Sequence, residues 1–300
     1  MKIRNGFNPW VVLSMLVVLS SIANAQATRT WVSGVGDDAN PCDRTAPCKT
    51  FAGAISKTAA SGEIDCLDPG GFGGVTITKA ITIDCHGTLG SVLVSGTNAI
   101  VVAAGSSDVV NLRNLEIQGL GGSGLIGVSF LSGRMLHLEN VSIYGFGTAG
   151  VSVSGSTFLQ LRAHNLLVTD SQVGITVTTS SGTAFANLSN VTISNVVTNA
   201  IQASTRAAIL VRDSTLSLSG VAFNQTGSSS ANLTNCQITN NGTGIQSVAG
   251  SGVGLFGNTF ILNSTALNPN SGTIYTDGNN EFAGNGTIGS PNGGNPGFKM

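Results

Sequence analysis

The sequence has little charge. Asp, Glu, Lys and Arg together make up 9% of its 300 residues, whereas an ordinary globular protein contains about 25%. The 13 basic residues are scattered along the chain, so it lacks the concentrated positive surface that binds nucleic acid or anionic lipid. We therefore expect no nucleic-acid partner.

Long apolar runs are missing after residue 25, so we expect no transmembrane segment in the rest of the chain. Lys2 and Arg4 precede an apolar stretch, Val11–Ile22, and Ala23–Ala25 has the small residues of a cleavage site. The stretch is about a dozen residues long, short of the roughly 20 that span a bilayer. We predict a signal peptide (1–25) cleaved near Ala25 and a secreted or periplasmic protein. Removal of the signal peptide leaves 11 basic and 14 acidic residues, a formal charge of −3.

Low charge and 41 glycines would suit a disordered chain, but 41% of the residues are hydrophobic, enough to form a core. Val, Ile, Thr, Ser, Asn and Gly dominate, and these residues favour strands and turns. The length fits one elongated domain or two compact ones.

An Asn-centred motif decides between these organisations. Its clearest copies are Leu112–Ile117, Leu138–Ile143, Leu188–Ile193 and Leu233–Ile238. The centres lie 22 to 26 residues apart, at Asn114, Asn140, Asn165, Asn190, Asp213, Asn235, Asn258 and Asn280. Such a period is typical of a solenoid, in which each repeat forms one coil.

A second, alternating motif interleaves with the first, as at Gly150–Val153 and Gly174–Val177. Each repeat therefore holds two or three short strands separated by Gly, Ser or Asn turns. Nothing between the repeats resembles a helix, which excludes leucine-rich solenoids, and propeller blades need about 40 residues. The sequence predicts an all-β fold, a right-handed parallel β-helix.

The central Asn of each motif is expected to form a bend between strands. Asn tolerates left-handed backbone, and its amide can bond to the next amide along the stack. The apolar residues at −2, +1 and +3 then stack inward, since equivalent residues of successive coils lie about 4.8 Å apart. We interpret seven asparagines as this structural ladder: Asn114, Asn140, Asn165, Asn190, Asn235, Asn258 and Asn280.

The two ends of the chain differ from the middle. Residues 49–60 place Phe51, Ala54 and Ile55 on one helical face, which predicts a short helix that caps the core. We expect a loop and this capping α-helix in residues 26–61, the β-helix in 62–285 and a flexible C-terminal tail in 286–300, rich in Gly, Asn and Pro.

The segment around this helix resembles the N-terminal part of bacterial secreted right-handed β-helix repeat proteins, which belong to the pectate-lyase-like superfamily. The resemblance lies in Trp31–Ser33, Gly36–Asp38, Asn40–Cys42, Pro47–Phe51 and Ala54–Ile55. It is specific over residues 30–85, and the repeats extend it to about residue 285. It implies the fold and export, and it carries little about activity.

Five cysteines occur in a chain expected to be exported, where disulfides persist. Cys42 and Cys48 flank a short loop and are expected to pair. Cys66 and Cys85 both follow an Ile-Asp dipeptide, and the sequence leaves open whether they form a second bridge between neighbouring coils. Cys236 occupies the inward +1 position and is interpreted as a small buried hydrophobe.

Outward positions before the central Asn form two columns in which charge and imidazole gather. The −1 column reads Arg113, Glu139, His164, Ser189 and Arg212, and the −3 column reads Asn111, His137, Arg162, Asn187 and Leu210. In one interpretation Asn111, Arg113 and Arg162 bind a glycan while His137, Glu139 or His164 moves a proton. In the other, these side chains form a solvated face on which Glu139 pairs with Arg113 or His164.

The chemistry known in the superfamily can be compared with these residues. A pectate-lyase-type site resembles a calcium ion bound by several carboxylates on neighbouring coils, and the acidic residues Asp108, Glu116, Glu139, Asp170 and Asp213 never align in one column. Carboxylates flanking a glycosidic bond are likewise not evident. Asp37 and Asp38 offer ligands for calcium, the one cofactor that the sequence suggests, but an Asx-rich turn explains them equally well.

Three functions remain open at this point. We favour a non-catalytic exported protein that binds glycans or mediates surface contact, because a carboxylate cluster is missing. The alternative is a polysaccharide lyase or glycoside hydrolase that acts on an acidic polysaccharide. The third is a hydroxyl-bearing surface such as an ice binder, based on outward Thr and Ser residues such as Thr192 and Thr215.

Overall fold

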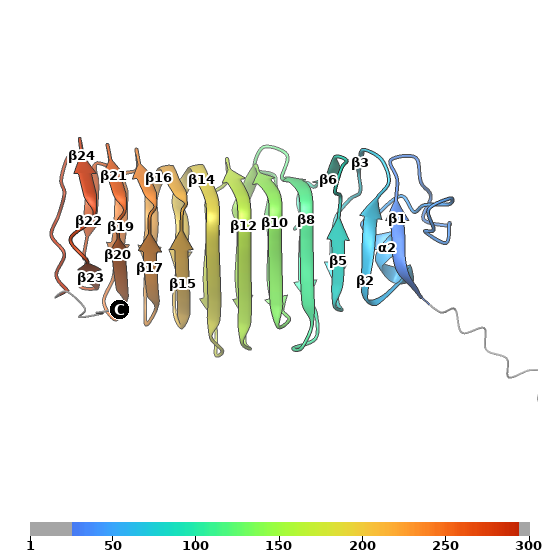
Figure 1. Cartoon of the computed structure of the whole chain (residues 1–300), viewed down its shortest axis with the longest axis horizontal. Helices are drawn as coiled ribbons and strands as arrows, with labels where there is room; N and C mark the ends of the chain where they lie inside the picture. The colour runs from blue at the N-terminus through green and yellow to red at the C-terminus, as the bar shows by residue number, and fades with distance from the viewer. Residues whose placement is uncertain (1–25, 294–300) are drawn as a thin grey trace, which may run out of the picture.

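The computed structural model describes residues 26–293. The predicted signal peptide (1–25) and the last seven residues of the predicted tail (294–300) lie outside this range. The described chain winds into a stack of parallel strands that runs from β1 at one end to β24 at the other (Figure 1). The predicted fold class, a parallel β-helix with one short helix near the N-terminus, is confirmed.

Three faces make up each coil, and we call them faces A, B and C in the order in which the chain meets them. Face A holds β1 (Ala27–Val32), β2 (Thr58–Cys66), β5 (Ile81–Asp84), the first halves of β8 (Val109–Gln118), β10 (Met135–Tyr144) and β12 (Leu159–Thr169), the start of β14 (Ala184–Ala203), and β15 (Ala207–Arg212), β17 (Ser230–Thr234), β20 (Gly252–Phe256) and β23 (Thr273–Thr276).

Face B holds the second halves of β8, β10 and β12, the middle of β14, and β3 (Gly70–Gly71), β6 (Gly90–Leu93), the start of β16 (Thr215–Gln225), β18 (Gln237–Thr239), β21 (Thr259–Ile261) and β24 (Glu281–Ala283). Face C holds the ends of β14 and β16, and β4 (Val75–Ile77), β7 (Ile100–Ala103), β9 (Gly124–Ser132), β11 (Phe146–Gly155), β13 (Val173–Thr179), β19 (Thr243–Ser247) and β22 (Thr265–Asn268).

The repeat sets the register of the stack. Leu112 pairs with Leu138, Leu138 with Ala163 and Ala163 with Leu188, and all four side chains are buried. The predicted inward stack at the −2 position is therefore confirmed. Burial of each Leu or Val side chain in such a column stabilises the fold by roughly 1.5–3 kcal/mol, because apolar surface is removed from water.

The bend between faces A and B is formed by residues with left-handed backbone. Asn114, Asn140, Asn165 and Asn190 have φ between 52° and 55°, as expected of the central Asn. Their amides form one ladder, in which Asn140 Nδ2 donates to Asn114 Oδ1 (3.1 Å), Asn165 to Asn140 (2.7 Å) and Asn190 to Asn165 (3.5 Å).

Three members of the predicted ladder lie outside it. Asn235 belongs to a separate pair, and the predicted position of Asn258 and Asn280 at the bend is wrong. Asn235 (φ 54°) donates to Asp213 Oδ1 at 2.6 Å, and this pair is separate from the first ladder. Gly257, with φ 61°, takes the next bend, which places Asn258 and Asn280 one position later. Asn258 is fully buried, and its Nδ2 donates to Leu233 O (2.9 Å) and Asn280 Oδ1 (3.0 Å). These two amides therefore form an inner ladder that satisfies buried backbone groups.

The capping helix α2 (Phe51–Lys57) is shorter than the predicted 49–60, because both of its ends are fixed by side chains. Thr50 is the N-cap and its hydroxyl accepts a hydrogen bond from Gly53 N (2.9 Å). Thr58 begins β2, and its hydroxyl donates to Ala54 O (2.8 Å). Phe51 and Ala54 are fully buried, as predicted, while Ile55 is partly buried.

The stack extends beyond the predicted β-helix boundaries. Strand β1 pairs in parallel with β2, so stacked strands begin at Ala27 rather than at residue 62. At the other end Thr287 bridges Thr265, and Asn292 bonds to Ile274 N (2.9 Å). The first and last described segments thus cover the two ends of the solenoid.

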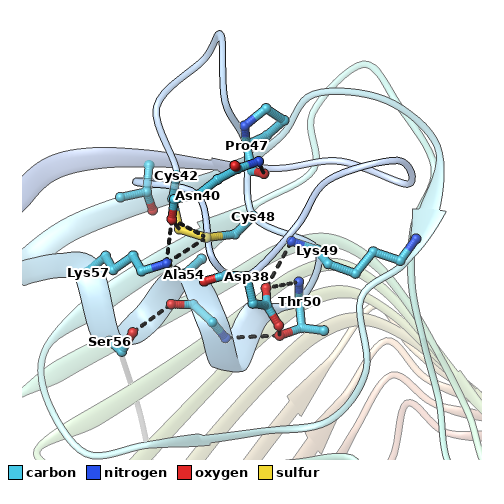
Figure 2. Close-up of a disulfide and its surroundings, with 12 residues drawn as sticks. Asp38, Asn40, Cys42, Pro47, Cys48, Lys49, Thr50, Ala54, Ser56 and Lys57 are labelled. Atoms are coloured by element: carbon cyan, nitrogen blue, oxygen red, sulfur yellow. Dashed lines mark hydrogen bonds between the residues drawn. A yellow bond between two sulfur atoms is a disulfide. The ribbon is translucent and has the colours of Figure 1, made fainter.

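The predicted Cys42–Cys48 disulfide is present, and so is the Cys66–Cys85 bridge that the sequence left open. Cys42 and Cys48 bridge a loop beside α2 (Figure 2), with a Cα–Cα distance of 4.6 Å. Cys66 and Cys85 join β2 to the residue after β5, with a Cα–Cα distance of 4.7 Å. Cys236 is free and buried, as predicted.

The Asn ladder supplies the first testable prediction. Asn140→Ala removes two amide hydrogen bonds. It also leaves Ala in a left-handed backbone conformation that Asn tolerates better, so the free energy of unfolding should fall by about 1–2 kcal/mol. Asn140→Gly should cost less, because Gly adopts this backbone freely. Urea unfolding measures both.

Asn232→Ala is the matched control for that measurement, because Asn232 is exposed on face A and lies in an ordinary strand. An Asn140→Ala protein as stable as Asn232→Ala would contradict the structural role of the ladder.

Candidate functional site

The predicted site residues lie side by side on the outer surface of face A. Asn111, His137 and Arg162 are register partners on β8, β10 and β12. Arg113, Glu139 and His164 form the adjacent column on the same three strands. The structure therefore brings all six together, on the face where the motif placed them.

Glu139 pairs with Arg113, at 3.2 Å between Oε2 and Nε, and not with His164. His164 Nδ1 lies 3.1 Å from the hydroxyl of Ser189 on the next coil. Arg162 is exposed and forms no ion pair with any residue in the 26–293 range. Arg162 is therefore the cation of this group that remains available to a carboxylate ligand.

His137 is half-buried between these charges. Burial lowers the pKa of His137, and the neighbouring Arg162 and Arg113 lower it further, while Glu139 opposes them. Its imidazole is therefore neutral at pH 7 and carries one nitrogen able to accept a hydrogen bond or a proton.

The same columns continue toward the N-terminus into a group of carboxylates. Asp84 is the register partner of Arg113, Asp65 pairs with Asp84, and Trp31 pairs with Asp65. Glu63 lies two residues before Asp65 on β2, so both side chains face outward. These carboxylates are not among the five acidic residues compared in the sequence, and the expectation that a carboxylate cluster is missing is wrong for these first coils.

A surface cleft of about 560 Å³ opens over these carboxylates. It is lined by Arg29, Trp31, Arg44, Glu63, Asp65, Cys66, Leu67, Asp84 and His86. The sequence reasoning missed these residues because the first coils lack the Asn motif, so their outward positions were not assigned.

Arg29 holds two of the carboxylates. Its guanidinium forms an ion pair with Glu63, and its Nε lies 2.9 Å from Asp65 Oδ2. The hydrogen bond from Arg29 lowers the pKa of Glu63. Burial, followed by the hydrogen bond and charge of Glu63, raises the pKa of Asp65 to about 6 in spite of Arg29. Asp65 therefore holds its proton in a range where Glu63 is ionised.

Asp84 has different partners. Its Oδ1 accepts hydrogen bonds from His86 N (2.9 Å) and from Asn114 Nδ2 (2.7 Å). Asn114 is the first amide of the ladder, so the ladder ends on the carboxylate of Asp84.

Asp37 and Asp38, the candidate calcium ligands, accept hydrogen bonds from backbone N–H groups. Asp38 Oδ1 accepts hydrogen bonds from Lys49 N and Thr50 N, both at 2.9 Å (Figure 2), and Asp37 Oδ1 accepts one from Ala39 N (2.9 Å). Within residues 26–293, no group of three or more His, Cys, Asp or Glu side chains is arranged to hold a metal ion.

Comparisons with known proteins agree on the fold. Residues 173–291 match the family model described as "Right handed beta helix region". Among solved structures, pectate lyase Pel9A is similar at a TM-score of 0.67 and 12% identity, over 88% of this chain and 77% of that chain. A rhamnogalacturonan lyase is similar at a TM-score of 0.53 and 12% identity, over 82% and 75%. No curated protein matches the sequence.

The chain is a right-handed β-helix protein with a pectate-lyase-like fold. At this level of identity the two solved structures show the fold alone. In the described residues, no helix is long and apolar enough to cross a membrane.

Charge is distributed unequally over the three faces of this right-handed β-helix. The strands of face C contain no Asp, Glu, Lys, Arg or His. Face B contributes Glu116 and Glu281. Face A carries the rest of the strand charges, and they concentrate between β1 and β12.

The raised pKa of Asp65 predicts a pH dependence of stability. Between about pH 4 and 6 the unfolded chain loses the Asp65 proton while the folded protein keeps it, so the free energy of unfolding should fall as pH rises through this window. Asp65→Asn should remove this contribution. Thermal unfolding from pH 4 to 7 measures it, with Glu281→Gln, an exposed carboxylate of face B, as the control that keeps the wild-type profile. Identical profiles for Asp65→Asn and wild type would contradict the assignment.

Proposed function

We propose that this exported protein binds an acidic polysaccharide along the charged part of face A, from β2 to β12. The observation that carries the proposal is the concentration of charge and imidazole there in a chain with 9% charged residues. At about 4.8 Å per strand, the five strands from β2 to β12 span roughly 20 Å. An extended chain of several sugars fits along this length.

Individual side chains support an acidic ligand. Arg162 is exposed and has no carboxylate partner among the described residues, so its guanidinium is free to form paired hydrogen bonds with a uronate carboxylate. Asn111 and the neutral His137 beside it supply uncharged donors and acceptors for hydroxyl groups. Trp31 offers an aromatic surface at the N-terminal end of the same face.

The comparisons and the disulfides are consistent with this role. The two similar solved structures bear the names of lyases of pectate and rhamnogalacturonan. Two disulfides in the described chain are typical of proteins outside the reducing cytosol. Both features support an extracellular or periplasmic polysaccharide ligand.

Cleavage of the bound polysaccharide is the second candidate, and Asp65 favours it. A carboxyl group with a pKa of about 6 next to an ionised Glu63 can exchange a proton near neutral pH, as general acids and bases do. The carboxylates of the cleft weaken the argument for a purely non-catalytic protein, which rested on their expected absence.

The binding proposal predicts that Arg162→Ala weakens the affinity for polygalacturonate oligosaccharides about tenfold, since loss of one charge-assisted contact costs about 1.5 kcal/mol. Calorimetric titration at fixed ionic strength measures it. Arg212→Ala is the control. Arg212 lies on β15 of the same face, beyond the proposed binding region that ends at β12, so its loss should leave the affinity unchanged. Equal losses of affinity in the two variants would mean that only the overall charge of the protein matters, which would contradict the proposal.

Cleavage is tested with the full chain on polygalacturonate and alginate, with and without calcium. Unsaturated ends would identify a lyase, and reducing ends without unsaturation a hydrolase. In either case we expect the product to disappear in Asp65→Asn and to remain in Glu281→Gln. Binding of the polysaccharide without any cleavage product would support the non-catalytic function instead.

A further inference from the structure

The Cys66–Cys85 disulfide lies directly behind the carboxylates of the cleft. Cys66 follows Asp65 and Cys85 follows Asp84, so each bridged sulfur belongs to the residue next to an acidic one. Side chains alternate along a strand, which places both Asp side chains outside and both Cys side chains inside. Cys85 is fully buried, while Cys66 is 8% exposed and lines the cleft.

The bridge lies where pairing between the two coils is interrupted. The register of β2 with β5 runs from Gly62 and Ile81 to Asp65 and Asp84. Pairing resumes at Gly70 and Gly90, and in between Leu67 N donates to Val32 O (2.8 Å) and Cys85 N donates to Arg113 O (3.3 Å), each to the coil on its far side. Local opening begins where strand pairing is interrupted, and the disulfide is the covalent link across this interruption.

Two like charges directly opposite each other on paired strands favour separation of the strands. Arg29 forms an ion pair with Asp65, and Asn114 donates a hydrogen bond to Asp84, but neither side chain bonds to both carboxylates. The covalent link therefore holds together a pair of acidic residues that their own electrostatics would move apart.

The packing around the bridge leaves it little freedom. Gly90, at the start of β6, lies against it so closely that a Cβ at this position would overlap Cys85 Sγ. The contact fixes Cys85, and with it the neighbouring Asp84, against the next part of the chain.

We infer that the Cys66–Cys85 disulfide is the positioning element of the cleft, holding Asp65 and Asp84 side by side for the polysaccharide. This role deepens the proposed function and rests on it for the identity of the ligand. When the bridge is absent, the two coils separate locally between the paired stretches, water reaches Asp65, and Asp84 moves away from it.

The other disulfide provides a matched control. Cys42 and Cys48 are six residues apart and close a loop beside α2, and Lys57 Nζ donates to Asn40 O just before this loop (Figure 2). Neither cysteine lines the cleft. The loop carries Arg44, which lines the cleft, but neither bridged cysteine adjoins Asp65 or Asp84, so loss of this bridge removes a covalent link near the same end of the protein while the link behind the two carboxylates stays.

The experiment compares Cys66→Ala/Cys85→Ala with Cys42→Ala/Cys48→Ala in the full chain, after circular dichroism has shown that each is folded. The first readout is the titration of the Asp65 carboxyl carbon by NMR. We expect its midpoint to fall by about one pH unit in the first variant, because burial and the neighbouring charge both decrease, and to stay at about 6 in the second. A wild-type titration in the first variant overturns the inference.

The second readout is affinity for a polygalacturonate oligosaccharide as a function of pH. Loss of affinity with a shifted Asp65 titration in the first variant alone supports both proposals. A shifted titration in a protein whose wild type binds none of the probe supports positioning and contradicts the proposed function.

Gly90→Ala serves if the first double variant does not fold. It keeps both cysteines, and its added methyl displaces Cys85, so the Asp65 titration should move in the same direction. An unchanged Asp65 titration in folded Gly90→Ala overturns the inference.

Discussion

The parallel register between successive coils is the constraint on which the rest of this structure depends. Backbone hydrogen bonds fix each residue above its counterpart in the next coil, and a shift of one residue would exchange the inner and outer surfaces. The inward column of Leu112, Leu138 and Leu188 and the outward column of Arg113 and Glu139 therefore have the same cause. Chemistry on such a scaffold is created by stacking, since residues about 25 positions apart in sequence become neighbours about 4.8 Å apart.

The Asn ladder connects this register to the candidate site. Each Asn donates its Nδ2 to the Oδ1 of the residue one coil nearer the N-terminus, so the amides all point the same way. The first amide, Asn114, needs an acceptor without a competing donor, and the carboxylate of Asp84 meets this requirement. Asp213 ends the ladder of Asn235 in the same manner, and Asp170 accepts from Asn195 Nδ2 at 2.5 Å.

This arrangement explains why several acidic residues look isolated in the sequence. Asp170 and Asp213 have left-handed backbone themselves, with φ of 52°, and stand where a ladder begins. Their carboxylates are structural, whereas Asp84 both ends a ladder and lines the cleft. One residue thus joins the bend that shapes every coil to the surface that we propose binds the ligand.

The sequence was sufficient for the fold and for six of the site residues because both follow from a repeat that can be counted. Wherever the Asn motif is present, it specifies which side chains point outward, and the structure places Asn111 to His164 accordingly. The carboxylate cluster lies in coils without the motif, so its register depends on long-range pairing of β1, β2 and β5. A weak signal was present, since Ile64–Cys66 and Ile83–Cys85 have the same residues, Ile-Asp-Cys, and therefore share a register.

The asparagines near the C-terminus show the limit of such counting. Spacing alone assigns Asn258 to the bend, but Gly257 adopts the left-handed backbone there. Asn258 can then turn inward, because Cys236 N, Leu233 O and Asn280 offer its amide a complete set of partners. A buried amide is acceptable only when each of its groups is bonded, and that condition is a property of three coils at once.

The distribution of ion pairs over face A separates supporting residues from residues that remain available. Arg29 is engaged by Glu63 and Asp65, and Arg113 by Glu139, so these two cations fix the positions of carboxylates. Arg162 lies one coil beyond Glu139 and has no such partner among the described residues. A polyanion that approaches this face would meet an open guanidinium at β12 and, at β2, the carboxyl of Asp65, whose pKa is about 6. The two ends of the charged strip therefore offer different chemistry, an anion-binding group and a proton carrier, and a ligand must extend across the coils between them to use both.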